Sequence, residues 1–410
     1  MGGKASIYMV LGFSLIFLVA SMNYGRLTGQ AVDNNVEYYK NTMAHNIAVS
    51  GANMASNQIF IDKDWSAGYS NLPFGGGYIN VKVEDAGQKK KRITSTGSYQ
   101  GLPKKVVILL QPSGYSKYAY YTNIFPGNKY LGTGDTITGP FHTNGKLNVQ
   151  GSPVFQGKAS AKNGLKLSGN ATPKFYGGFE SGVDVPLNWS TSDIKAAAQA
   201  GGFVFNAGGA GKVDVRLTFN GNATITYSKR FDSGSWSHDS TVALSAFAPN
   251  GIIYVEKGNI YMKGIINGRY SVIADQSSGN GTGNVYIEDD IRYKSNPLTH
   301  PGSTDMLGII ASNNVLISDN SANQLNVNID ASIFSYKGGL GLVNENMAYS
   351  GTLKIFGGVV EYQGRTTSKV SGSTITNGYR ERIVFDERLM LNNPPYFPAT
   401  DKYEVVSWLE

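Results

Sequence analysis

Residues 251–273 read GIIYVEKGNIYMKGIINGRYSVI, and this stretch decides the fold class. Short apolar runs begin at Ile252, Ile260 and Tyr270, and glycine or asparagine residues stand between them. β-Branched and aromatic residues suit strands, while glycine and asparagine accept the positive φ of tight corners. The stretch therefore predicts short strands joined by tight turns, with no helices between them.

The same pattern extends in both directions along the chain, over residues 146–167 and 284–329. Its short, unevenly spaced runs predict a right-handed parallel β-helix-like body at 116–410, in which coils stack and Asn and aromatic side chains form ladders. The alternative is a β-sandwich. In a β-helix Tyr286 points outward. The inward side chains that share one core are then Ile253, Val255, Ile260, Val272, Val285, Ile287, Val315, Ile317 and Val327.

Two segments interrupt the pattern. An alanine-rich run follows Ser190–Asp193 and ends at Gly201-Gly202, which predicts a short capped helix near 192–200. An Asn220-Gly221-Asn222 turn lies between two alternating runs and predicts a β-hairpin near 212–231. We expect both as insertions on one side of the body.

Residues 62–115 predict a small antiparallel β module. Tyr78–Val83 and Arg92–Gly97 alternate with period two, and Lys105–Leu110 forms a third apolar run before Pro112. A helix laid over such a three- or four-stranded antiparallel meander would bury one face of each strand and form one small core.

Residues 1–61 predict a long N-terminal membrane or filament helix. Ala5–Met22 is uncharged and approaches the roughly 20 residues that span a bilayer. An apolar stripe at helical spacing continues through Val32, Val36, Tyr39, Met43 and Ile47, and Met54, Ala55 and Ile59 extend it. A cleavable signal peptide and a buried core helix are the alternatives. The side chains expected in the membrane or filament core are Ala5, Ile7, Val10, Leu11, Phe13, Leu15, Ile16, Phe17, Leu18 and Val19.

A hydrophobic helix that runs into an amphipathic one, followed by ITSTGSYQGLPKKVVILL at 93–110, resembles the minor pilins and pseudopilins of type IV filament systems. The resemblance implies that the apolar helix half is first anchored in the inner membrane and later packs in a filament core. Prepilins carry a glutamate at the fifth mature position. In the best-matching stretch, Gly12–Phe17, that place is occupied by Phe17, and cleavage after Gly3 would not supply a glutamate either.

The body also resembles an uncharacterised bacterial family, a domain of unknown function whose members begin with the same pilin-like helix. The matching phrases are GPFHTNGKLNV at 139–149, PVFQGKAS at 153–160 and RIVFDERLMLNNPPYFPATDKYEVVSWLE at 382–410. This second resemblance implies an architecture and no particular activity.

Signatures of catalysis are sparse. The chain has no cysteine, and its four histidines lack metal-binding spacing. We expect His142 to be a turn residue bonded to backbone. Glu288, Asp289 and Asp290 are weak metal candidates, but neighbouring carboxylates on a strand point to alternate faces, so a solvated strand end is expected. The sequence predicts no enzyme activity, no catalytic residue and no cofactor.

Charge is unevenly distributed. Residues 1–115 carry 11 Lys and Arg against 6 Asp and Glu, within a chain of net charge +7, so the body is close to neutral. No basic field covers the body, which argues against nucleic acid as a partner. The basic patch Lys89, Lys90, Lys91 and Arg92 lies at a predicted hairpin tip. It is either simply solvated or in contact with anionic lipid or acidic polymer.

Taken with the resemblance, these features predict a structural or accessory subunit of a bacterial cell-surface filament or secretion-associated system. The expected location is the inner membrane facing the periplasm, or an extracellular filament. Expected partners are the membrane and other pilin-like subunits. The alternatives are a membrane-anchored adhesin or surface-polysaccharide-binding module and, third, a polysaccharide-active enzyme.

Overall fold

The computed structural model describes residues 2–87, 89–209, 211–276, 282–371 and 374–410. The chain divides into two units. The helix–sheet unit comprises residues 1–112 and 402–410, and the body comprises residues 113–401. The first has a long helix on an antiparallel sheet, and the second has a large mixed sheet that is mostly parallel. The protein is therefore mainly β with a long N-terminal helix, as the sequence predicts.

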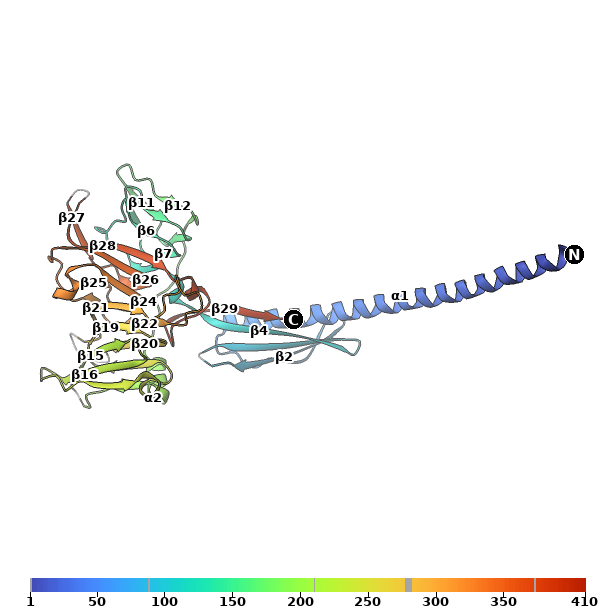
Figure 1. The fold of residues 1–410 in the computed structure, drawn as a ribbon, viewed down its shortest axis with the longest axis horizontal. Helices are drawn as coiled ribbons and strands as arrows, with labels where there is room; N and C mark the ends of the chain where they lie inside the picture. Colours follow the sequence, from blue (N-terminus) through green and yellow to red (C-terminus); the bar gives the residue numbers. More distant parts are fainter. Residues whose placement is uncertain (1, 88, 210, 277–281, 372–373) are drawn as a thin grey trace. The chain divides into compact units, whose positions relative to one another are not determined.

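In the helix–sheet unit, helix α1 spans Gly2–Ile61, and its C-terminal part packs on a five-stranded sheet of order β1-β2-β3-β4-β29 (Figure 1). Strands β1 to β4 pair antiparallel in chain order. The strand bounds are β1 Tyr69–Phe74, β2 Gly77–Asp85, β3 Lys91–Tyr99, β4 Leu102–Gly114 and β29 Ala399–Leu409.

The sequence prediction allowed a fourth strand without giving the range of β1, and it placed the C-terminal residues of β29 in the body. Strand β29 lies beside β4, although the whole body separates these two strands in the sequence. A strand's own alternation shows that it has a buried face, but it does not reveal which distant strand it joins.

Small residues set the distance between helix and sheet. Ala44, Ala48 and Ala52 are completely buried. At Gly97 in β3, an added Cβ would lie 2.3 Å from the backbone nitrogen of Ala48 and 2.4 Å from the carbonyl oxygen of Ala44. The helix backbone therefore rests directly on β3, at a separation that only glycine permits.

The predicted apolar stripe on the helix is correct only toward its C-terminal end. Ile47 is 2% exposed, whereas Val32, Val36 and Tyr39 are 55%, 46% and 56% exposed. Tyr39 meets the end of the sheet only through the ring of Tyr99, and the buried face of the helix comprises Ile47, the alanines and Ile59. Helical spacing identifies an apolar face, and the length of the partner decides how much of that face is covered.

In the body, a first ladder of parallel strands runs in the order β14-β18-β20-β22-β24-β26-β5-β7-β10-β13. The bounds are β5 Tyr120–Ile124, β7 Phe141–Thr143, β10 Ala159–Ala161, β13 Phe179–Ser181, β14 Phe203–Phe205, β18 Ile252–Glu256, β20 Arg269–Asp275, β22 Met306–Ala311, β24 Val327–Ser335 and β26 Tyr349–Gln363.

A second parallel ladder runs in the order β15-β19-β21-β24-β26-β28-β6-β9-β12. Strands β24 and β26 are long enough to belong to both ladders. The further bounds are β15 Val213–Asn220, β19 Ile260–Ile266, β21 Val285–Tyr293, β28 Thr374–Phe385, β6 Thr136–Ile137, β9 Val154–Phe155 and β12 Lys174–Phe175.

Shorter pairings complete the body. Strand β23 pairs in parallel with β21 and β25, and β8 pairs with β11. Strands β16, β17 and β27 pair antiparallel with neighbours in the chain. The bounds are β8 Leu147–Gln150, β11 Leu165–Ser168, β16 Thr224–Phe231, β17 Ser240–Ala243, β23 Val315–Ile317, β25 Leu340–Leu342, β27 Ser368–Ser371, α2 Ser192–Gly201, α3 Leu244–Phe247, η1 Tyr115–Lys117, η2 Ser321–Gln324 and η3 Glu387–Met390.

The order of the first ladder is not the order of the chain. From β5 the chain builds outward through β7, β10 and β13, and then continues through α2 to β14 at the opposite end. It returns strand by strand to β26, which pairs with β5 through Val360 and Tyr121. The segment that connects β13 to β14 and contains α2 covers the outer face of the ladder. There Trp189 packs against Phe334, with ring centroids 5.3 Å apart.

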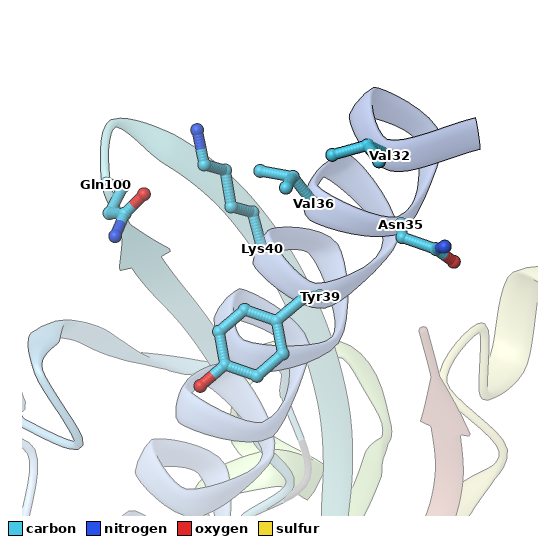
Figure 2. Close-up of a pocket in the computed structure, with 6 residues that line it drawn as sticks. All are labelled: Val32, Asn35, Val36, Tyr39, Lys40 and Gln100. Atoms are coloured by element: carbon cyan, nitrogen blue, oxygen red, sulfur yellow. The ribbon is translucent and has the colours of Figure 1, made fainter. Parts of the chain in front are cut away.

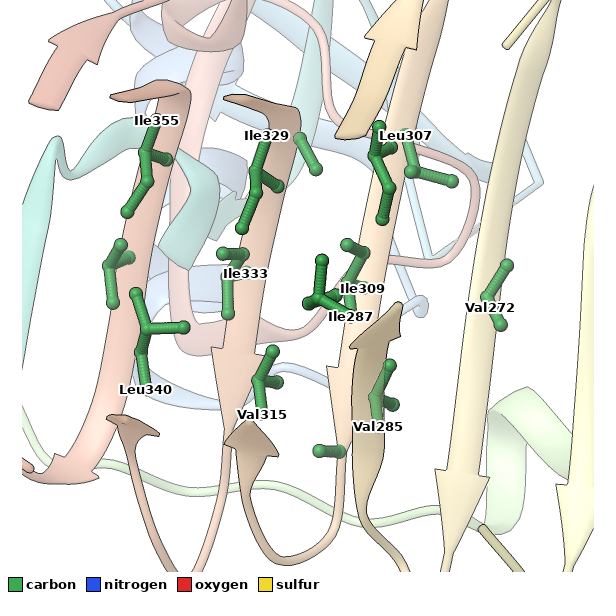
Figure 3. Close-up of a cluster of buried hydrophobic side chains, with 14 of the residues drawn as sticks. Val272, Val285, Ile287, Leu307, Ile309, Val315, Ile329, Ile333, Leu340 and Ile355 are labelled. Atoms are coloured by element: carbon green, nitrogen blue, oxygen red, sulfur yellow. The ribbon is translucent and has the colours of Figure 1, made fainter. Parts of the chain in front are cut away.

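The inward side chains of the body form one continuous apolar core (Figure 3), and a second apolar cluster around Tyr254 and Phe334 lies on the outer face of the first ladder. Parallel register places the core side chains in rows, such as Ile260, Val285, Val315 and Leu340 on successive strands. The nine predicted inward side chains are at most 1% exposed, which confirms that prediction. Tyr286 lies on the opposite face and stacks on Tyr261, with centroids 4.7 Å apart.

An asparagine ladder closes one corner of these strands. The Asn314 side chain donates to Asn284 at 3.3 Å, and Asn284 donates to Asn259 at 3.1 Å. Asn259 in turn donates to the Asp214 carboxylate at 3.2 Å. Each buried amide is thus satisfied by the equivalent residue of the next strand, which is why asparagine recurs before the apolar runs.

Candidate functional sites

The N-terminal half of helix α1 is an apolar surface without cover in the described chain. The helix over residues 3–61 contains an 18-residue window that is long and apolar enough to cross a membrane, and 0% of that window is buried. Leu15 and Phe17 are 66% and 70% exposed. The same holds for the rest of the predicted membrane or filament-core segment, and within Ala5–Met22 only Ala20 is half-buried.

A pocket of about 370 Å³ lies where the helix passes the end of the sheet. Figure 2 shows Lys40 of α1 beside Gln100 in the β3–β4 turn, with Val36 and then Val32 farther toward the N-terminus of the helix. The ring of Tyr39 meets that of Tyr99 edge-on at 6.0 Å. The pocket is thus a mostly apolar recess at the point where the exposed helix begins.

The predicted basic patch lies at the β2–β3 hairpin and is partly neutralised there. The Lys91 ammonium donates to the Trp65 carbonyl at 2.9 Å. Across the hairpin, Arg92 pairs in register with Glu84 and Lys91 with Asp85. The pKa of Glu84 is lowered, first by its hydrogen bond from Lys82 and further by charges that include Arg92. Lys89 is exposed, and Lys90 is half-buried.

The acidic residues Glu288, Asp289 and Asp290 form a bulge in β21. They stand opposite Lys263 alone, between the pairs Met262–Ile287 and Gly264–Ile291. Glu288 accepts from Ser318 Oγ at 2.6 Å. Asp290 accepts from the backbone nitrogen of Asn328 at 2.7 Å and pairs with Arg292 at 2.7 Å. The bulge shifts β21 from pairing with β23 to pairing with β24.

These carboxylates point to separate partners and do not converge. Within the described residues, no group of three or more His, Asp or Glu side chains is placed to hold a metal ion. Asp289 accepts from the backbone nitrogen of Asp290 at 2.7 Å, which stabilises the bend itself. The arrangement suits a structural corner better than acid–base chemistry on a sugar, which needs two carboxylates facing one bond.

His142 is fully buried in β7, on the outer face of the first ladder. Its ring nitrogens lie 2.8 Å from Ser160 Oγ and 2.8 Å from Asn144 Oδ1, so both are satisfied by side chains and not by backbone. Burial lowers the pKa of the imidazole, which keeps it neutral. Buried and fully bonded, His142 is a packing residue, and its partners correct the expectation of a backbone-bonded turn histidine.

A cleft of about 470 Å³ on the body was missed by the sequence analysis. It is lined by Arg292, Leu325, Asn326, Asn328, Thr352, Lys354 and Arg382. We call it the donor cleft. Lys354 and Arg382 are direct partners on the parallel strands β26 and β28. They lie far apart in the sequence and carry no motif, so only the strand register brings them together.

A buried polar cluster lies where β26 pairs with β5, at the point where the late strands of the body meet the early ones. Tyr120 donates its hydroxyl to Glu361, and the other carboxylate oxygen of Glu361 accepts from the backbone nitrogen of Leu340 at 3.0 Å. Lys129 donates to the Tyr120 hydroxyl at 3.0 Å. Burial raises the pKa of Glu361. The cluster therefore links a late strand to an early one.

Near this cluster, burial raises the pKa of Asp135 to about 6. The Asp135 carboxyl is protonated below about pH 6 in the folded chain but only below about pH 3.8 in the unfolded chain. Its protonation therefore contributes fully to the free energy of unfolding below pH 3.8, and this contribution is lost as the pH rises through 6. We expect Asp135→Asn to stabilise the body at pH 7 by roughly 1–2 kcal/mol more than at pH 4.5. Urea unfolding at both pH values tests this, and an equal effect at both would contradict it.

No protein-family model and no characterised protein matches this sequence. Among solved structures, the crystal structure of the competence-associated pilin ComZ from Thermus thermophilus matches at 12% sequence identity and a TM-score of 0.32, over 90% of this chain and 97% of ComZ. A TM-score this low carries no structural argument. The resemblance of 139–160 and 382–410 to an uncharacterised family stays a prediction.

Proposed function

We propose that this protein is a pilin-like structural or accessory subunit of a bacterial surface filament or secretion-associated system. Its N-terminal helix would be anchored in the inner membrane, with the rest of the chain in the periplasm or on an extracellular filament. One observation carries the proposal. A single 60-residue helix is apolar and uncovered in its N-terminal half and packs on an antiparallel sheet in its C-terminal half.

The division of this helix has a physical reason. Exposed apolar surface is unfavourable in water by about 25 cal/mol per Å², so the N-terminal half requires lipid or other helices around it. Lys4 precedes the apolar segment and Arg26 is the next basic residue, which favours a cytoplasmic N-terminus. Val32, Val36 and the pocket beside Gln100 continue the uncovered surface up to the sheet. In a filament, a neighbouring subunit would cover them.

For the body we propose a right-handed parallel β-helix. The support is the register, because strands two apart in the chain pair in parallel repeatedly: β18 with β20, β20 with β22, β19 with β21 and β21 with β23. Connections between parallel strands are nearly always right-handed. The asparagine ladder and the stacked tyrosines repeat along the same direction. A β-sandwich would instead consist of antiparallel sheets.

We further propose that the protein is not an enzyme. The three adjacent carboxylates shape a bulge, and the one fully buried histidine is bonded on both sides. Both sets of residues have structural partners that account for them.

The proposed anchoring is tested by cell fractionation of the full-length protein. We expect it with membranes or sheared filaments. Replacing Leu11, Leu15 and Leu18 by arginine should move most of it to the soluble or degraded fraction, because arginine at a helix centre costs about 2.5–3.5 kcal/mol per residue on insertion. Thr28→Arg, beyond the apolar segment, is the control and should leave the distribution unchanged.

Intact mass of the same material separates the alternatives. A full-length or shortened chain that still pellets with membranes or filaments supports the proposal. A wild-type chain that has lost Ala5–Met22 and is soluble and monomeric without detergent would identify a signal peptide and overturn it.

A further inference from the structure

The donor cleft presents hydrogen-bond donors and positive charge. Its lining contains three cations, Arg292, Lys354 and Arg382, and no carboxylate. Leu325, at its edge, is 73% exposed. Arg292 is ion-paired with Asp290, so Lys354 and Arg382 are the two cations of the lining without an ion-pair partner in the described residues.

Two of these cations oppose each other directly. Lys354 and Arg382 are paired in register on β26 and β28, where side chains of neighbouring strands lie about 5 Å apart. Like charges placed side by side in a sheet destabilise it. Neither residue forms an ion pair or hydrogen bond within the described part of the chain. The folded body thus maintains a repulsion that a bound anion would relieve.

The neighbouring polar groups add directionality. The side-chain carbonyl oxygen of Asn326 accepts from the backbone nitrogen of Thr352 at 2.8 Å. The NH₂ group of the same side chain remains to donate to another acceptor. Thr352 contributes a hydroxyl to the lining. Two carboxylates outside the lining act on its cations. Asp290 is bonded to Arg292 at 2.7 Å and to Asn328. Asp330 accepts from the backbone nitrogen of Tyr293 and interacts electrostatically with Arg292 and Lys354. The groups of the cleft that remain to bind a ligand are therefore mainly hydrogen-bond donors and cations.

We propose that the donor cleft binds a carboxylate-bearing carbohydrate, such as a uronic-acid unit of an acidic surface polysaccharide. Lys354 and Arg382 would bind the carboxylate, while Asn326 and Thr352 would bind ring hydroxyls. The exposed Leu325 provides apolar surface for a sugar face. A nucleic acid fits less well, because it requires a long row of cations and the body is near neutral outside this cleft. This proposal does not depend on the filament role.

Binding of trigalacturonate to the full-length protein in detergent, measured by calorimetry at low salt, tests the proposal. We expect saturable one-site binding, with Lys354→Gln and Arg382→Gln each weakening it by about tenfold or more, because charge-assisted bonds are lost. Lys174→Gln is the matched control. Lys174 is exposed and lies on the same row of the second ladder, reached from Arg382 through β6 and β9, but it does not line the cleft.

Three further probes distinguish the outcomes. Neutral maltotriose should not bind, and inorganic phosphate and a single-stranded DNA oligomer should bind more weakly than trigalacturonate. Both glutamine variants should unfold at a temperature at least as high as that of the wild type, because each removes a like-charge repulsion. The proposal is overturned if trigalacturonate does not bind, if Lys174→Gln weakens binding equally, or if DNA binds more tightly with the same dependence on Lys354.

Discussion

Val285→Asp is expected to unfold the body while the helix–sheet unit remains folded. Val285 is 0% exposed and lies in register between Ile260 and Val315, inside the continuous core. An aspartate there buries a carboxylate with no cationic partner, at a cost of several kcal/mol, about 3–5 in comparable cases. Since stacked strands depend on their neighbours, the loss should spread along the ladder.

Limited proteolysis with mass mapping checks this result. In the variant, new cleavage sites should appear within 203–342 at protease concentrations that leave the wild type intact. The neighbouring substitution Tyr286→Asp is the control, because that side chain is half-buried on the outer face and stacks only on Tyr261. It should cost about 1 kcal/mol. Equal sensitivity of the two variants would contradict the inward–outward assignment of β21.

Gly97→Val is expected to release helix α1 from its sheet. The Cβ would approach the backbone of Ala48 and Ala44 to less than 2.5 Å, and a helix backbone cannot rotate away as a flexible side chain can. The helix must move out, which exposes Ile47 and Ile59 and costs about 3 kcal/mol or more. Residues 44–61 should then become accessible to protease and lose slow hydrogen exchange.

Ser98→Val in the same strand is the control for Gly97→Val. Ser98 is half-buried and adjacent, so its side chain points to the other face of β3. Valine is favoured in strands, and we expect a change within about 0.5 kcal/mol. Protection of residues 44–61 that is unchanged in Gly97→Val would show that the helix does not depend on this close approach.

The candidate sites differ in how far sequence could reveal them. The apolar segment around Leu15 is a local property of composition, and the structure leaves it uncovered as expected. The acidic run at Glu288–Asp290 is equally visible in the sequence, but its role as a bulge depends on Lys263 in another strand. The donor cleft has no sequence signal, because Lys354 and Arg382 are ordinary cations until parallel register pairs them.

Sequence by itself determined the long N-terminal helix, the β character of the rest and the inward positions from Ile253 to Val327. Those features follow from periodicity, turn residues and the absence of charge, which operate over a few neighbouring residues. Only the tertiary structure decided that β26 closes on β5, that β29 joins β4, and that Gly97 lies under the helix backbone. Strand pairing is made by backbone groups that every residue carries, so the choice of partner depends on how the whole chain packs.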